Sequence, residues 1–262
     1  MTTTETTRLM EAVRQAALAA GERIKVDWDA PRDVRLKGRI DLVTATDLAV
    51  EEGLKEALAR VLPEAAFLAE ETAARTALSG LTWIIDPVDG TTNFAHRFPF
   101  VCTSVALYDG QEPVVGCVNA PMLGQCFTAG KGAGAYCNGE PIRVSGTGRL
   151  EAALVATGFP YAIRENLDEI MADLRVMLAE TQGIRRPGSA ALDLAYVAAG
   201  RFDAFYELAL NPWDVAAGAL LVAEAGGRVG SYRPDGPYRL GDFRILASNG
   251  ALHESILALL AG

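Results

Sequence analysis

The sequence Asp-Pro-Val-Asp-Gly-Thr-Thr-Asn occupies residues 86–93, directly after the apolar run Leu-Thr-Trp-Ile-Ile of residues 81–85. The apolar run is typical of a buried strand, so Asp86 and Asp89 would project where that strand ends. Gly90 lets the backbone turn and approach a ligand closely, and the N–H groups after it can hold a phosphate oxygen. Carboxylate oxygens are ligands that Mg²⁺ prefers. The stretch therefore predicts a site for a divalent cation and a phosphate group.

Two further acids stand at the ends of expected elements. Glu70 follows the short apolar strand 66–69, and Asp214 opens an expected helix. Buried carboxylates repel one another unless a cation or a proton lies between them. Each acid alone could be a surface group, and Asp214 could simply be an N-cap. Two or more Mg²⁺ ions would satisfy all four acids, with the carbonyl of Val88 as an additional ligand.

Other polar residues give weaker signals. Asp47 could cap the second helix or touch a metal-bound water. Glu207 ends the apolar strand 202–206 and could accept hydrogen bonds from a polyol or pair with an arginine. The pair Arg185–Arg186 is a basic spot in an acidic chain, so it is interpreted as a solvated pair or a rim contact. Ser189 is a plausible N-cap of the following helix.

No nucleophilic set is evident in the sequence. His96 and His253 form no Ser/His/Asp or Cys/His arrangement, so covalent catalysis is not expected. The four cysteines show no Cys-x-x-Cys pair and no zinc-like spacing to a histidine, and we expect buried, reduced thiols. They are Cys102, Cys117, Cys126 and Cys137.

Composition describes an ordinary globular chain of 262 residues, of which 50% are hydrophobic and 22% charged. The formal net charge of −9 argues against a nucleic-acid backbone as the main ligand, because proteins that bind one usually carry a basic face. The first residues lack the basic and apolar regions of a signal peptide, and no apolar run approaches 18 residues. We therefore expect a cytoplasmic protein without a membrane span.

The apolar pattern changes near residue 145. Before it, the spacing predicts an amphipathic helix over 6–26, a second helix that ends before Pro63, and an antiparallel meander over 101–145. After it, helices and strands alternate three times. The expected helices there cover 167–178, 190–199, 213–225 and 251–261. Layers of helices and sheets of the α+β class are the expected architecture.

These residues together resemble the inositol monophosphatase family of Mg²⁺-dependent phosphatases, nearly end to end. The motifs that carry the resemblance are 41–47, 69–72, 83–94 and 213–218. The resemblance implies a layered α-β-α-β-α sandwich of the inositol monophosphatase and fructose-1,6-bisphosphatase type, often a homodimer, and often blocked by Li⁺. We expect one compact unit: residues 1–145 carry most metal ligands, and residues 146–262 carry Asp214 and the substrate contacts.

The resemblance also implies the roles of individual residues. Two or three Mg²⁺ ions per site would be held by Glu70, Asp86, the Val88 carbonyl, Asp89 and Asp214. The catalytic residues would be Glu70, Thr91 and Asp47, with Thr91 and Asp47 helping to activate a metal-bound water. The substrate would contact Gly90, Thr91, Gly188, Ser189, Ala190 and Glu207.

The leading hypothesis is hydrolysis of a small phosphomonoester by a metal-activated water, with myo-inositol 1-phosphate as substrate. Fructose 1,6-bisphosphate, histidinol phosphate, or another sugar or polyol phosphate is an alternative. The nucleotide phosphatases of the superfamily tend to carry Lys-Glu where this chain has Thr92-Asn93, which argues against them. A regulatory binding role on the same fold is a different class of function, although an intact acid set opposes it as the sole role.

Overall fold

The computed structural model describes residues 2–30, 34–36, 42–72, 78, 80–233 and 235–261. Its first large sheet is built from residues 66–141. The strands are, in spatial and chain order, β3 (Ala66–Ala69), β4 (Leu81–Asp89), β5 (Cys102–Asp109), β6 (Glu112–Ala120), β7 (Gln125–Gly130), β8 (Gly134–Cys137) and β9 (Glu140–Pro141). All neighbours are antiparallel except β3 and β4. The predicted meander is therefore confirmed.

The second large sheet has the spatial order β11-β10-β12-β15-β13-β14. Its strands are β10 (Leu154–Thr157), β11 (Gly183–Arg185), β12 (Ala204–Leu208), β13 (Arg228–Ser231), β14 (Gly236–Pro237) and β15 (Arg244–Ser248). Strand β10 runs parallel to both β11 and β12, whereas β15 pairs antiparallel with β12 and β13. A short pair, β1 (Val34–Leu36) with β2 (Leu42–Thr44), stands apart from both sheets.

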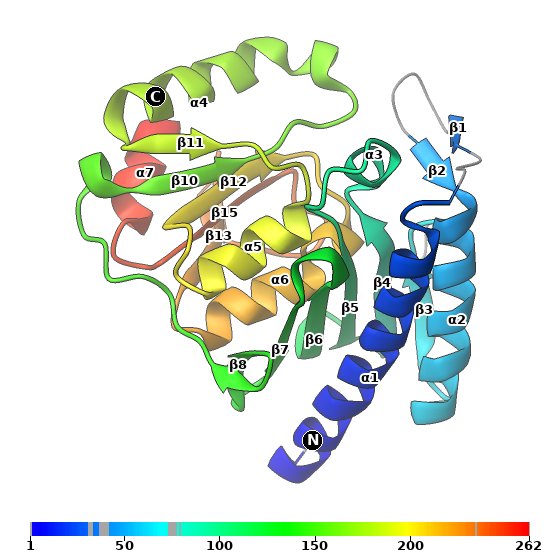
Figure 1. Cartoon of the computed structure of the whole chain (residues 1–262). Coiled ribbons are helices and arrows are strands. Elements are labelled where there is room, and N and C mark those ends of the chain that lie inside the picture. The colour runs from blue at the N-terminus through cyan, green and yellow to red at the C-terminus, as the bar shows by residue number, and fades with distance from the viewer. Residues whose placement is uncertain are drawn as a thin grey trace.

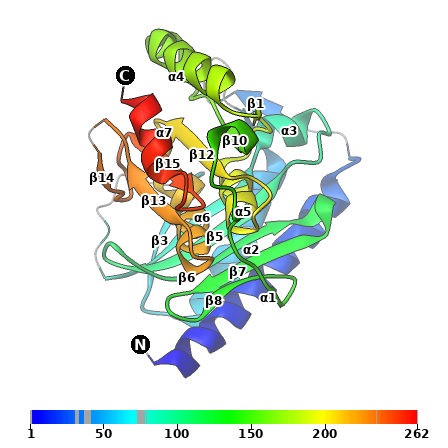
Figure 2. The ribbon, with the colours of Figure 1, turned by 90° about the vertical axis from the view of Figure 1, so that its left-hand side faces the viewer.

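The described chain contains seven α-helices. They are α1 (Thr3–Asp27), α2 (Ala45–Val61), α3 (Thr91–Ala95), α4 (Leu167–Glu180), α5 (Ala190–Ala198), α6 (Pro212–Glu224) and α7 (His253–Leu260). Helices α1 and α2 pack on one face of the first sheet, and α5 and α6 lie between the two sheets (Figure 1). Helices α4 and α7 cover the far face of the second sheet (Figure 2). The expected layered α-β-α-β-α sandwich is confirmed.

Local sequence explains why these helices form where they do. Apolar residues at helical spacing, such as Leu9, Val13 and Ile24, give α1 one buried face. Thr2 and Glu5 close its first turn as a capping box. The predicted helix ends differ from the observed ones by up to three residues. Helices α5 and α6 pack very closely against each other. A Cβ atom on Gly218 of α6 would lie only 2.5 Å from the Cβ atom of Leu194 on α5, so no larger side chain fits there.

One strand differs from its prediction in a way that shapes the site. The predicted strand 81–86 continues to Asp89 as β4, with a register shift against β5 between Asp86 and Asp89. Pro87 has no N–H to donate, so the ladder breaks there and resumes where Asp89 faces Cys102. The strand therefore ends three residues later than predicted, and both carboxylates belong to it. They flank an irregularity within it.

Two further expectations can be compared with the structure, and two cannot. All four cysteines are free, but only three are buried, because Cys137 is partly exposed. Within the described residues, no helix combines the length and the apolar character needed to cross a bilayer. Asp41, the first residue of the 41–47 motif, lies outside the described residues. The division into halves at residue 145 stays a prediction.

Candidate active site

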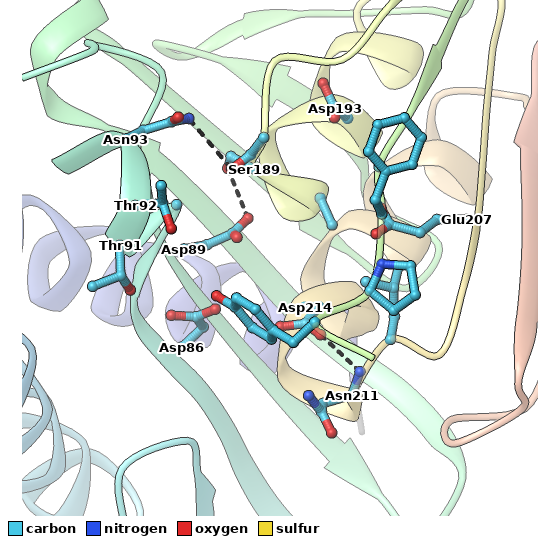
Figure 3. A pocket seen from close by; sticks show the side chains of 18 of the residues that line it. Asp86, Asp89, Thr91, Thr92, Asn93, Ser189, Asp193, Glu207, Asn211 and Asp214 are labelled. Atoms are coloured by element: carbon cyan, nitrogen blue, oxygen red, sulfur yellow. Dashed lines mark hydrogen bonds between the residues drawn. The ribbon is translucent and has the colours of Figure 1, made fainter. Parts of the chain in front are cut away.

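A pocket of about 310 Å³ opens between the two sheets. Its walls come from the irregular end of β4, from α3, from the loop 158–163, and from the N-terminal ends of α5 and α6 (Figure 3). The structure brings together in this pocket all but one of the predicted site residues. Those that line it are Glu70, Asp86, Val88, Asp89, Gly90, Thr91, Gly188, Ser189, Ala190, Glu207 and Asp214. Asp47 lies behind Thr91.

The four predicted metal-binding acids reach the pocket from different elements. Glu70 directly follows β3, and its N–H donates to the Ile85 carbonyl at 3.1 Å, which ties it to β4. Asp86 and Asp89 come from β4, and Asp214 comes from the first turn of α6. In the part of the chain that the structure describes, no three His, Cys, Asp or Glu side chains have the spacing of a preformed metal site.

Asp86 shows that the pocket suits a cation. Its side chain is 2% exposed, and its Oδ1 atom has no hydrogen-bond partner among the described residues. Burial raises the pKa of Asp86 well above its usual value, and the neighbouring Glu70 and Asp89 carboxylates raise it further. Leaving a buried carboxylate oxygen unpaired costs several kcal/mol on the scale of about 2–7 kcal/mol for polar groups. A divalent cation would relieve both the missing partner and the repulsion.

Asp89 is held by contacts from the second half of the chain. Its Oδ2 atom accepts hydrogen bonds from the Ser189 hydroxyl at 2.7 Å and from the Ala191 N–H at 2.8 Å. Burial raises the pKa of Asp89 to about 6, although these two hydrogen bonds act in the opposite direction. Ser189 does occupy the predicted N-cap position of α5, but its side chain makes no capping hydrogen bond. The hydroxyl binds Asp89 instead.

Asp214 is fixed by the first turn of α6. The N-cap is Asn211, and Asp214 stands three residues later, where its Oδ2 atom accepts a 2.7 Å hydrogen bond from the Asn211 N–H. The interpretation of Asp214 as the N-cap itself was thus wrong. Burial, and then repulsion from Asp89, raise the pKa of Asp214. The capping box orients the carboxylate, whose Oδ1 atom is not used by that bond.

Thr91 and Asp47 form a hydrogen-bonded pair beside Asp86. The Thr91 Oγ1 atom lies 3.0 Å from the Val88 carbonyl oxygen and 3.2 Å from Asp47 Oδ1. Asp47 also accepts the Thr44 N–H at 3.0 Å, as part of the capping box of α2. Gly90 has a φ of 93°, and a Cβ there would meet the Phe100 carbonyl oxygen at 3.0 Å. Glycine is therefore required where the chain turns into α3.

Glu207 lies at the other end of the pocket, near the end of β12. It is 7% exposed, and burial raises its pKa to about 8. Gly158 packs directly on this carboxylate, because a Cβ there would lie 2.0 Å from Glu207 Oε2. Arg186 also lines the pocket and stacks over Phe159, with its guanidinium carbon 5.2 Å from the ring centroid. The rim-contact interpretation of Arg186 fits this position.

Asn93 and Asp193 are among the residues that line the pocket and that sequence reasoning did not assign to the site. Asn93 donates 2.8 Å hydrogen bonds to the carbonyl oxygens of Phe100 and Pro187, so it fastens α3 to the loop before α5. Asp193 lies on α5 with its carboxylate buried. The signal for Asp193 was an acid inside the apolar run 190–198, where a helix buried on all sides has no place for an unpaired charge.

The chain is similar to known proteins over nearly its whole length. A model of the inositol monophosphatase family matches residues 5–261. An inositol-1-monophosphatase from Synechocystis sp. is 42% identical over 96% of this chain and 88% of that protein. A fructose-1,6-bisphosphatase/inositol-1-monophosphatase from Aquifex aeolicus is 36% identical over 95% of this chain and 94% of that protein. The crystal structure of extragenic suppressor protein suhB from Bartonella henselae has a TM-score of 0.90 and 39% identity, over 97% of this chain and 98% of that chain.

Proposed function

The chain belongs to the inositol monophosphatase family, and on that basis we propose that it hydrolyses myo-inositol 1-phosphate to inositol and phosphate. It is a phosphatase, and the superfamily is metal-dependent. The observation that carries the proposal is that one pocket combines the Glu70, Asp86, Asp89 and Asp214 carboxylates with Glu207 and the N-terminal turn of α5. Such a pocket has one end suited to a cation-neutralised phosphate and another suited to hydroxyl groups.

We propose that the cation is Mg²⁺, with two or three ions held by the four acids and the Val88 carbonyl. Hard oxygen donors without sulfur or nitrogen ligands favour Mg²⁺. The orphaned Asp86 Oδ1 atom supports this assignment. When bound, the ions would lower the pKa of a water molecule and neutralise the phosphate oxygens.

The residues of the chain would position the reaction. The N–H groups of Gly90 and Thr91 stand at the start of α3, where backbone donors can hold a phosphate oxygen. The Thr91 hydroxyl, 3.2 Å from Asp47 Oδ1, can pass its proton to Asp47 while it accepts one from the attacking water. Burial raises the pKa of Asp47, which improves it as a proton acceptor near neutral pH. Glu70, which is also one of the proposed metal ligands, would be the third catalytic residue.

The leaving alcohol would lie against the second half of the chain. Glu207 and the backbone of Gly188, Ser189 and Ala190 line that part of the pocket. A carboxylate accepts hydrogen bonds from two hydroxyl groups, which suits a polyol ring. The Aquifex aeolicus relative is named for activity on fructose 1,6-bisphosphate as well, so a sugar bisphosphate is the second candidate substrate.

Phosphate release by the purified protein tests the proposal. The panel would hold myo-inositol 1-phosphate, fructose 1,6-bisphosphate, histidinol phosphate and 3′-phosphoadenosine 5′-phosphate, each with Mg²⁺ and with EDTA. We expect Mg²⁺-dependent release that is strongest with inositol 1-phosphate. A preference for another ester would contradict the substrate, and release that EDTA does not stop would contradict the cation.

We also propose that the protein forms a homodimer. Three apolar side chains of α4 are exposed, namely Leu167, Met171 and Leu178. An apolar stripe of this kind is typical of a surface that another molecule covers. Light scattering during size-exclusion chromatography tests the proposal, and a monomer mass at micromolar concentration would contradict it. Cytoplasmic location and sensitivity to Li⁺ stay predictions from the sequence.

A further inference from the structure

Asp193 is a buried acid in the pocket that the proposed reaction leaves without a role. It lies in the first turn of α5, it is 1% exposed, and it lines the same pocket as Asp89 and Glu207. Its Oδ1 atom has no hydrogen-bond partner in the residues that the structure describes. Because buried polar atoms in folded proteins are nearly always hydrogen-bonded, an orphaned oxygen in a pocket points to a partner that enters it.

The surroundings of Asp193 favour a hydrogen-bond donor as that partner. Burial raises the pKa of Asp193, the carboxylates of Glu207 and Asp89 raise it further, and Arg186 acts in the opposite direction. Its neighbours along α5, Leu192 and Leu194, are fully buried and offer no donor. A neutral hydroxyl group supplies a hydrogen bond without adding negative charge, so it satisfies this carboxylate better than any anionic group could.

The position of Glu207 explains why a second acceptor is useful. Gly158 packs against the Glu207 carboxylate so closely that only a hydrogen atom fits between them. One side of that carboxylate is therefore closed to the substrate. Figure 3 shows Asp193 on α5 and Glu207 on β12, both away from Thr91 and Asp86. A ring with several hydroxyl groups could thus reach both acids while its phosphate faces Asp86.

We propose that Asp193 is a further substrate-binding residue, whose unpartnered carboxylate oxygen accepts a hydrogen bond from a hydroxyl group of the alcohol part of the ester. Asp193 and Glu207 would then each accept a hydrogen bond from a different hydroxyl group of one substrate. This proposal rests on the proposed phosphatase function and deepens it. It makes the enzyme selective for polyhydroxylated phosphate esters over esters of the same shape that lack hydroxyl groups, because those leave both acids unpaired.

The test compares two esters with the same six-membered ring. We would measure kcat/KM for inositol 1-phosphate and for cyclohexyl phosphate, with wild type, Asp193→Asn and Asp193→Ala. Asp173→Ala is the matched control, because Asp173 is equally buried but lies on α4, hydrogen-bonded to Arg233. Asp193→Asn keeps the shape of the side chain, so it covers the case in which Asp193→Ala does not fold.

Loss of the charge-assisted hydrogen bond should lower kcat/KM for inositol 1-phosphate about tenfold in Asp193→Asn and up to about a hundredfold in Asp193→Ala. The value for cyclohexyl phosphate should change less than about twofold. The melting temperature of Asp193→Asn without substrate should stay level or rise, because an unpaired buried charge has been removed. Asp173→Ala should leave the ratio of the kcat/KM values for the two esters unchanged.

Equal losses on both esters would overturn the proposal, because they would show a general role in folding or catalysis. No loss on either ester would overturn it as well, because the Asp193 carboxylate would then contribute no hydrogen bond to the substrate. If wild type preferred another hydroxyl-bearing ester, the proposed substrate would fail. The comparison would then use that ester against its analogue without hydroxyl groups, and the same two results would decide the role of Asp193.

Discussion

The Ser189 hydroxyl donates a 2.7 Å hydrogen bond to Asp89 Oδ2 and so joins two residues that are 100 positions apart in the chain. Ser189 begins α5 of the second half, and Asp89 ends β4 of the first sheet. The Ala191 N–H binds the same oxygen at 2.8 Å, which leaves Oδ1 for other partners. A helix from one half therefore orients a candidate metal ligand of the other, and the site depends on how the two sheets pack.

Removing the Ser189 hydroxyl should weaken the binding of Mg²⁺ by the protein. In Ser189→Ala, Asp89 Oδ2 keeps the Ala191 N–H at 2.8 Å and the weak Cys102 thiol donor at 3.8 Å, so the carboxylate becomes less well oriented. Loss of such a supporting hydrogen bond typically costs about 10–100-fold in metal affinity or activity. We expect the Mg²⁺ concentration for half-maximal phosphate release to rise by that factor. Ser145→Ala is the control, because the Ser145 hydroxyl binds Asp203, which does not line the pocket. An unchanged Mg²⁺ requirement in Ser189→Ala would contradict this role.

For turnover, the hydroxyl group of Thr91 should matter more than the volume of the Thr91 side chain. Thr91→Val has nearly the same shape but cannot relay a proton to Asp47, whereas Thr91→Ser keeps the hydroxyl. General acid–base assistance is worth about 10²–10⁴-fold. We expect kcat to fall by about that factor in Thr91→Val and to recover within about tenfold of wild type in Thr91→Ser. Steady-state kinetics at saturating Mg²⁺ would measure this, and equal rates for the two variants would rule out the relay.

The acid cluster should destabilise the protein when no cation is bound. The raised pKa of Asp86 means that its charged form is disfavoured in the folded state. At pH 8 in EDTA, Asp86→Asn should therefore melt at a higher temperature than wild type, by about 2–4 °C for each kcal/mol of repulsion removed. Added Mg²⁺ should raise the melting temperature of wild type but not of the variant. Calorimetry that shows a Mg²⁺-induced rise in Asp86→Asn would contradict the assignment of Asp86 as a ligand.

Stability should also depend on pH through His253, which is buried at the start of α7. Its Nδ1 atom lies 2.8 Å from the Ser248 hydroxyl oxygen, and burial lowers its pKa to about 4. The unfolded chain takes up the proton near pH 6.5, so stability is complete above that value and is lost as the pH falls toward 4.

The variant His253→Gln isolates this effect from that of the buried pocket carboxylates, whose raised pKa values act in the opposite direction. Between pH 7 and pH 4.5, wild type should lose about 2 kcal/mol more free energy of unfolding than the variant does. Urea titrations at the two pH values measure the difference. Parallel losses in both proteins would show that His253 is not the titrating group.

The sequence predicted the parts of the site that are encoded locally. An apolar run followed by two aspartates, a glycine and two threonines indicates a strand, its end and a turn within a dozen residues. The same holds for Asp214 at the start of a helix. Pro87 carried a further signal that the prediction did not include. A proline inside a strand indicates a break in the hydrogen-bond ladder.

The remaining features arise from contacts between distant segments. Nothing near Ser189 in the chain indicates that its hydroxyl binds Asp89 rather than its own helix, since the N-cap position is the commoner use of serine there. The apolar run around Asp193 indicates a buried helix, but only the packing of α5 between the two sheets places its carboxylate in the same pocket as Asp89 and Glu207. Only the three-dimensional arrangement places these groups in one pocket.

The central claim is that Asp86, Asp89, Glu70 and Asp214 bind cations that catalyse phosphate-ester hydrolysis. Phosphate release from inositol 1-phosphate by wild type and Asp89→Asn, each titrated with Mg²⁺, tests it most directly. We predict Mg²⁺-dependent turnover by wild type and loss of nearly all turnover in Asp89→Asn, with both proteins folded by circular dichroism. Turnover by folded Asp89→Asn close to that of wild type would contradict the claim, and no turnover by either protein would favour a binding role on this fold.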